Sequence, residues 1–277
     1  MADFSAADIK RLRDLTAAGM MDCKKALEEA AGDFDAAVDI LRIKGAKGVG
    51  KREGRTASNG LVTAKHEGTK NGTLLELNCE TDFVAKSEPF ITLAERIVTH
   101  VAAVHPDDLD ALLGTDLDGK SIKEVLDEAN AFIAEKIEIR RFAYFDQGAV
   151  YSYLHKTSPD LPPQLGVLLE LTGESADVAK DVAQHIAAFA PLYVRREDVP
   201  ADVVDNERRI ADATAREEGK PEAALAKIVE GRVNGYFKET CLIEQAFAKD
   251  NKKSVGQVLT EAGVDVTRFA RFKVGQA

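Results

Sequence analysis

The sequence predicts an α+β protein in which a three-helix bundle precedes a duplicated core of two small antiparallel-sheet and helix subdomains. Helical periodicity fills about the first 40 residues. After about residue 60, four blocks each occur twice in the same order, which indicates two copies of one scaffold. A helical segment found only in the second copy predicts a hairpin insertion. The repeated blocks are 74–77 with 168–171, 100–103 with 185–188, 120–129 with 253–262, and 141–145 with 268–272.

These patterns divide the chain into three parts. Residues 1–54 are expected to form the helical bundle and its linker, 55–146 the first core subdomain, and 147–277 the second core subdomain with its insertion at about 195–240. Shared blocks are expected to build the common core, so segments found in only one copy are where we look for function.

The N-terminal bundle is predicted from capping residues followed by apolar residues at helical spacing. Ser5 with Asp8 forms a capping-box pattern, and Asp22 and Asp33 are the expected caps of the second and third helices. A Gly- and Lys-rich linker then runs from about residue 44 to residue 60, which predicts a tethered bundle.

The linker also contains a sequence that resembles a phosphate-binding loop. Residues 45–51 match the spacing G-x-x-x-x-G-K, but Arg52 stands where a Ser or Thr would hold Mg²⁺. A helical pattern precedes the match instead of the strand that such a loop requires. We therefore interpret this segment as a basic linker.

Each core copy is expected to contain a hairpin, helices and a third strand. In the first copy, 61–67 and 73–77 are predicted to pair through a turn at Asn71-Gly72, and in the second copy 150–154 pairs with 166–171. Ser121 with Glu124 predicts a capped helix, and the Arg-Phe-Ala blocks are expected to add the third strands. The insertion divides at residues 219–221 into two helical runs, which predicts an antiparallel helical hairpin.

Composition excludes several classes of protein. A net charge of −10 disfavours direct binding of nucleic acid, no segment is long and apolar enough for a membrane span, and the N-terminus lacks the apolar core of a signal peptide. The three cysteines are expected to be free thiols, and a cytoplasmic location is expected. No hydrolase motif or metal-ligand spacing is present, so we expect no enzyme active site, metal or cofactor.

The remaining feature is a segment of about nine residues, within 78–89, that the second copy lacks. It places Asp82 directly before Phe83, after the second strand of the hairpin. Phe83 has two interpretations: a core residue, as is usual for Phe, or an exposed wedge that contacts a partner. Asp82 could likewise be a local cap or part of that contact.

Two segments, 12–27 and 76–86, closely resemble the signature sequences of bacterial elongation factor Ts. The resemblance extends over essentially the whole chain. It implies a ubiquitin-associated-like bundle, two core subdomains and a protruding dimerisation insert. It also implies a guanine-nucleotide exchange factor, without covalent chemistry, that acts on the GTPase elongation factor Tu in translation elongation.

The resemblance further implies which residues meet the partner. In this family the segment corresponding to Thr81, Asp82, Phe83 and Val84 intrudes beside the partner's nucleotide and dislodges its Mg²⁺. Partner contacts are also expected at Leu12, Arg13, Met20, Met21 and His155. For Leu12 the alternative is packing inside the bundle, because Leu at helical spacing usually faces a core. A homodimer within the complex is a further expectation. The alternative function is a non-catalytic adaptor or chaperone-like module, which would bind without changing GDP release.

Overall fold

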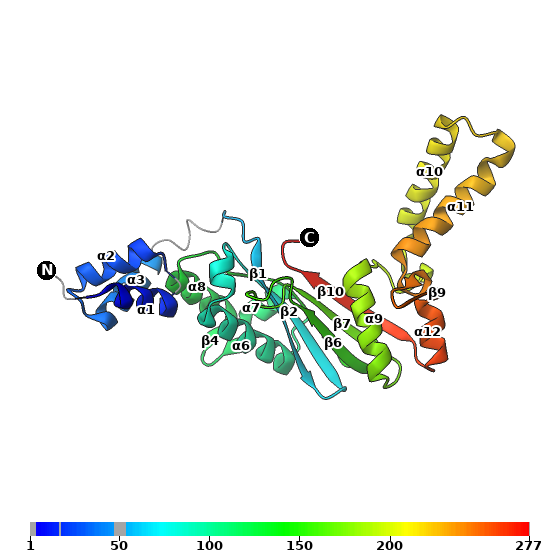
Figure 1. Ribbon diagram of the computed structural model, residues 1–277. Coiled ribbons are helices and arrows are strands. Elements are labelled where there is room, and N and C mark those ends of the chain that lie inside the picture. The colour runs from blue at the N-terminus through cyan, green and yellow to red at the C-terminus, as the bar shows by residue number, and fades with distance from the viewer. Residues whose placement is uncertain (1–3, 17, 47–53, 277) are drawn as a thin grey trace. The chain divides into compact units, whose positions relative to one another are not determined.

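The computed structural model describes residues 4–16, 18–46 and 54–276. It mixes helices with small antiparallel sheets, which confirms the α+β class (Figure 1). The chain forms two compact units, Met1–Phe145 with Leu154–Gly166 and Phe272–Ala277, and Asp146–Tyr153 with Val167–Arg271. The third helix extends to Ala46 and the first strand begins at Asn59, so the linker is shorter than expected. Most of the segment that resembles a phosphate-binding loop lies outside the described residues.

Three helices form the N-terminal bundle: α1 (Ala6–Thr16), α2 (Met20–Glu29) and α3 (Phe34–Ala46). The capping box is confirmed, because the Ser5 amide donates to Asp8 Oδ2 at 2.8 Å and the Asp8 amide to Ser5 Oγ at 3.3 Å. Asp33 Oδ1 accepts the Ala36 amide at 3.0 Å, as a cap should. The prediction for Asp22 was wrong. The N-cap of α2 is Gly19. Asp22 lies in the first turn, where its negative charge interacts favourably with the positive end of the helix dipole.

The bundle contacts the first core subdomain as well as being linked to it. Helix α3 lies against α8 (Ile122–Ile133), and Arg42 Nη2 is 3.9 Å from Glu128 Oε1. At the end of α3 the backbones approach so closely that a Cβ on Gly45 would lie 1.5 Å from the carbonyl oxygen of Ala131. The expected domain boundary at residue 54 remains a prediction.

The first subdomain contains a three-stranded antiparallel sheet of order β1 (Asn59–Glu67), β2 (Asn71–Cys79) and β5 (Glu138–Phe145). The hairpin and the third strand were predicted correctly, but the position of the turn was wrong. Glu67 pairs with Asn71, so Asn71-Gly72 begins β2 and the turn is formed by residues 68–70. Gly68 has φ +61°, a conformation that glycine adopts without steric cost, and it starts the turn.

Helices cover this sheet: α6 (Glu88–Val104), α7 (Leu109–Gly114) and α8, with the short strands β3 (Asp116–Leu117) and β4 (Lys120–Ser121) between the last two. The capping box of Ser121 and Glu124 at the start of α8 is confirmed. Completely buried side chains from β2, α6 and α8, including Leu77, Phe90 and Ile97, form the core against which the candidate site rests.

The second copy repeats this order of elements. Its sheet is β10–β7–β6, from β6 (Ala149–His155), β7 (Leu165–Leu171) and β10 (Val266–Lys273), which corresponds to β5–β2–β1. The remaining elements are α9 (Ala176–Phe189), β8 (Ala246–Phe247), β9 (Asp250–Ser254) and α12 (Val255–Glu261). The insertion is the predicted antiparallel hairpin of α10 (Ala201–Glu217) and α11 (Glu222–Thr240), which turns at Gly219 with φ +70° (Figure 1).

The duplicated Leu-Leu-Glu-Leu block places a buried carboxylate in each central strand, and the two environments differ. Glu170 accepts from the Gln147 amide at 2.8 Å, the Thr267 hydroxyl at 2.8 Å and Arg268 Nε at 2.8 Å. Burial alone would raise the pKa of Glu170, but these donors outweigh it and the pKa is lowered. At Glu76, burial raises the pKa of the carboxyl, and this effect outweighs the lowering by the hydrogen bond and charge of Arg141.

We therefore expect Glu170→Gln to lower the thermal stability of the fold at pH 7. Removing charge-assisted hydrogen bonds should cost about 1.5–3 kcal/mol. A carboxyl whose folded pKa is depressed stabilises the fold above its ordinary pKa of 4.5, and this contribution is lost as the pH falls through the folded value. The cost should therefore shrink in melting curves recorded near pH 3. Glu76→Gln is the matched control and should cost less at neutral pH. An equal cost at both pH values would contradict this account.

Candidate functional site

The extra segment of the first copy forms a single helical turn, α5 (Asp82–Ala85), between the end of β2 and the start of α6. Thr81 is the N-cap, and its hydroxyl accepts the Val84 amide at 3.3 Å. The Ala85 amide donates to the carbonyl oxygen of Thr81 at 3.1 Å, which closes the turn. Thr is among the residues favoured at helix starts, because its hydroxyl satisfies a free backbone amide of the first turn.

The side chains of this segment divide between the core and the surface. Val84 and Ala85 are completely buried in the core of the subdomain. Asp82 is exposed and forms an i,i+4 ion pair of 3.7 Å with Lys86. Phe83 is half-buried: it packs at the margin of the core cluster and keeps part of its ring at the surface. Phe83 is therefore partly a core residue, and its contact with a partner stays a prediction.

Arg13 from α1 stacks on the ring of Phe83. Its guanidinium carbon lies 3.9 Å from the centre of the ring, within the range of a cation–π contact. The structure thus brings together two residues that the sequence resemblance associated with a partner through separate segments.

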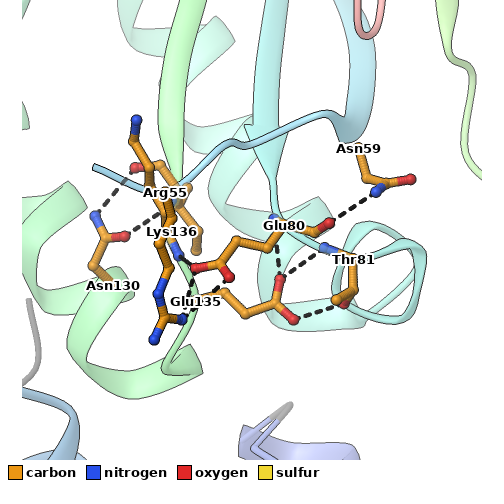
Figure 2. A network of polar contacts seen from close by, with 8 residues as sticks. Arg55, Asn59, Glu80, Thr81, Asn130, Glu135 and Lys136 are labelled. Carbon is orange, nitrogen blue, oxygen red and sulfur yellow. Dashed lines mark hydrogen bonds and ion pairs between the residues drawn. The ribbon is translucent and has the colours of Figure 1, made fainter. Parts of the chain in front are cut away.

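The turn before α5 is held by a network of polar contacts that crosses between two loops (Figure 2). Glu135, which follows α8, accepts the amides of Glu80 and Thr81 at 3.1 and 3.0 Å and the Thr81 hydroxyl at 2.6 Å. In the other direction, Glu80 accepts the Lys136 amide at 2.7 Å and Arg55 Nη1 at 3.2 Å. Asn59 Nδ2 donates to the carbonyl oxygen of Glu80 at 2.8 Å. None of these contacts was predicted from the sequence.

A buried thiol lies directly beneath the turn. Cys79 Sγ donates to the carbonyl oxygen of Thr81 at 3.2 Å. Burial raises the pKa of the Cys79 thiol, and the nearby charge of Glu135 raises it further, so the thiol stays neutral. A neutral, buried thiol is a poor nucleophile, so Cys79 serves packing. All three cysteines are free and buried, which confirms the expectation of free thiols.

The other residues associated with a partner lie on different elements. Leu12 is completely buried in the bundle core, so its side chain supports the shape of α1 without forming its surface. Met20 and Met21, at the start of α2, are 53% and 62% exposed. His155 is exposed at the end of β6. Sequence patterns missed Leu15 and Ile43, which are also large, apolar and exposed on the bundle.

Among the described residues, no group of His, Cys, Asp and Glu side chains could hold a metal ion. Within the same part of the chain, no helix has both the length and the apolar character needed to cross a membrane. An acidic and an aromatic side chain on a fixed turn can instead contact another macromolecule.

Comparisons with known proteins agree with this architecture. Residues 80–276 match the family described as Elongation factor TS. The chain is 64% identical over 276 residues to Elongation factor Ts of Acidothermus cellulolyticus and 62% identical over 278 residues to that of Thermobifida fusca, with 100% of both chains covered in each case. It is 59% identical over 277 residues to Elongation factor Ts of Streptomyces coelicolor, covering 99% of this chain and 100% of the relative. The chain therefore belongs to the elongation factor Ts family of translation elongation factors.

Proposed function

We propose that this protein is a guanine-nucleotide exchange factor for elongation factor Tu: it binds the GDP-bound GTPase, displaces Mg²⁺ and releases GDP so that GTP can bind. The observation that carries the proposal is the presentation of Asp82 and Phe83 at the surface on a turn that the fold holds rigidly from several sides. Membership of the family supports it.

The chemistry of the partner's site explains how a side chain could release a nucleotide without touching it. GDP is held by contacts to its phosphates and by a Mg²⁺ ion that requires near-ideal octahedral geometry. A ring inserted between the elements that position the metal disturbs that geometry. No covalent step is needed, and this chain requires no cofactor of its own.

The half-buried position of Phe83 fits this role. A wedge must resist displacement, and the inner part of the Phe83 ring rests on the subdomain core while Val84 is anchored beneath it. Asp82 is the more exposed of the pair, and it can contact side chains of the partner after exchanging its ion pair with Lys86. Met20 and Met21 supply apolar surface on the bundle for binding.

Exchange and adaptor functions differ in their thermodynamic coupling. An exchange factor must bind nucleotide-free elongation factor Tu more tightly than the GDP-bound form, and by the same factor it must weaken GDP. An adaptor would bind both forms equally. Titration calorimetry against the two forms should give affinities that differ by at least about 100-fold, or about 2.7 kcal/mol. Equal affinities would favour the adaptor.

We further propose that the hairpin of α10 and α11 mediates self-association or braces the second subdomain, while exchange depends on α5. Its base is firmly attached: Arg196 Nη2 donates to Glu244 Oε2 at 2.6 Å, Arg196 Nη1 donates to Asn234 at 2.7 Å, and the guanidinium stacks on Phe237. Further out, the helices remain side by side at Ala211 and Arg232, where Arg232 Nη1 donates to the Ala211 carbonyl oxygen at 3.5 Å.

Replacing residues 212–231 by a short Gly-Ser loop should therefore shorten the hairpin without disturbing its base. We expect lower self-association or a lower melting temperature, with GDP release per folded molecule changed by less than about threefold, since the removed residues and α5 belong to different compact units. Light scattering, melting curves and a release assay would measure this. Complete loss of exchange in a folded, truncated monomer would contradict the proposal.

A further inference from the structure

We propose that Glu135 is a positioning residue for nucleotide exchange: its carboxylate fixes the turn that starts α5 and thereby sets where Asp82 and Phe83 project. The inference rests on the proposed exchange function. Glu135 lies in another loop, more than 50 positions along the chain from the segment it holds (Figure 2).

Glu135 accepts hydrogen bonds with both of its carboxylate oxygens. Glu135 Oε2 accepts the amides of Glu80 and Thr81 at 3.1 and 3.0 Å, and Oε1 accepts the Thr81 hydroxyl at 2.6 Å. Hydrogen bonds to an ionised acceptor are shorter and stronger than those between neutral groups. One side chain therefore fixes the backbone and the side chain of the N-cap residue together.

The loop that carries Glu135 is itself held in place. Beside it, the Lys136 amide donates to Glu80 Oε1 at 2.7 Å, so the two loops exchange contacts in both directions. Asn130 of α8 secures the following residue, because the Ile137 amide donates to Asn130 Oδ1 at 2.6 Å and Asn130 Nδ2 donates to the Ile137 carbonyl oxygen at 3.1 Å. Glu135 is thus a fixed support, tied to α8 and to β5.

Helix α5 is too short to be stable alone. A helix of four residues cannot maintain its own direction in water, since helix nucleation is unfavourable. Its direction is set by its cap and by the burial of Val84. The Thr81 hydroxyl donates to Glu135 while it accepts the Val84 amide, so Glu135 orients the cap as well as the strand end.

The consequence for exchange follows from geometry. Phe83 lies two residues after Thr81, which Glu135 holds by hydrogen bonds. A rotation of this turn would change the direction in which the Phe83 ring projects. Displacements of about 1 Å at a reacting site can cost about 100-fold in rate. Removing the hydrogen bonds from residues 80–81 to Glu135 should therefore reduce the rate of nucleotide exchange more than the affinity for the partner, because binding also uses other surfaces.

The test compares Glu135→Ala and Glu135→Gln with the control Glu138→Ala. Glu138 is a half-buried Glu three positions away whose carboxylate pairs with Lys136 at 2.8 Å. For Glu135→Ala we expect the plateau rate of GDP release from elongation factor Tu to fall about tenfold and the half-saturating concentration to change less than about threefold. Glu135→Gln, which keeps one acceptor oxygen, should recover part of the rate. Glu138→Ala should match the wild type.

Two further measurements separate positioning from general stability. In the free chain, amide hydrogen exchange at Val84 and Ala85 should be about tenfold faster in Glu135→Ala, with protection in β1 and β2 unchanged. In a Phe83→Ala background, adding Glu135→Ala should change the release rate by less than about twofold, because Glu135 affects exchange by positioning Phe83.

Three results would overturn the inference. They are an unchanged plateau rate in Glu135→Ala, an unchanged amide exchange rate in α5, or an equal loss of rate with and without Phe83. The amide measurement needs no partner, so it shows whether Glu135 holds α5 in place independently of the proposed function. If the amides loosen as expected but the wild-type chain releases no GDP, the exchange function is wrong and the inference falls with it.

Discussion

Phe83→Ala is expected to lower the plateau rate of GDP release by about 10- to 100-fold, equivalent to about 1.4–2.7 kcal/mol of activation free energy. Affinity for nucleotide-free elongation factor Tu should fall by a smaller factor, because binding also uses the bundle and other surfaces. A residue that acts mainly in the displacement step changes the rate more than the affinity. Release of a fluorescent GDP, measured at saturating factor, and calorimetry give the two quantities.

The effect on stability separates this role from a purely structural one. Phe83 is half-buried and stacks against Arg13, so its removal should cost about 1–2 kcal/mol, below the roughly 3–5 kcal/mol of a fully buried ring. Phe90 is completely buried in the same cluster and provides the matched control. Phe90→Ala should have a much lower melting temperature, yet its folded fraction should still stimulate GDP release from elongation factor Tu. Strong destabilisation of Phe83→Ala with normal exchange by the folded fraction would show that Phe83 is only a core residue.

Deleting residues 1–54 is expected to weaken binding to elongation factor Tu by about 100-fold or more, or about 2.7 kcal/mol. The reason is the loss of Arg13 and of the exposed side chains of Met20 and Met21, since Met and Arg are enriched at interfaces. The core should remain folded, because its cluster is built from residues after the linker. Calorimetry measures the affinity, and circular dichroism the fold.

A milder change controls for the contact between the bundle and α8. The deletion also removes the ion pair of Arg42 with Glu128 and uncovers part of α8. The double change Met20→Ala and Met21→Ala keeps that contact and should weaken binding about tenfold. Lys25→Ala, an exposed change on the same helix, should have little effect. Unchanged affinity after both the deletion and the methionine change would count against a binding role for the bundle.

Local signals and internal repetition allowed most of the fold to be predicted. Ser5 with Asp8 and Ser121 with Glu124 mark helix starts because each pair satisfies backbone amides within one turn, whatever surrounds it. The repeated blocks predicted a hairpin and a third strand in each copy, and the break near Gly219 predicted the helical hairpin. These features depend on residues close together in the sequence or on comparison of the chain with itself.

Features that depend on distant residues were not predicted. Asn71-Gly72 is typical of a turn, but the pairing of the whole strand moved the turn to residues 68–70. The segment around Phe83 stood out as unshared, yet its partial burial depends on the core behind it and on Arg13 in front. Glu135 carried no signal at all, since a Glu between a helix and a strand usually faces solvent.

The most direct test of the exchange function is stopped-flow release of fluorescent GDP from elongation factor Tu at increasing concentrations of this protein. The account predicts a release rate that rises with concentration to a plateau at least about 100-fold above the spontaneous rate, and a plateau that is lower in Phe83→Ala. A release rate that stays at the spontaneous value while calorimetry shows the complex to be saturated would contradict it.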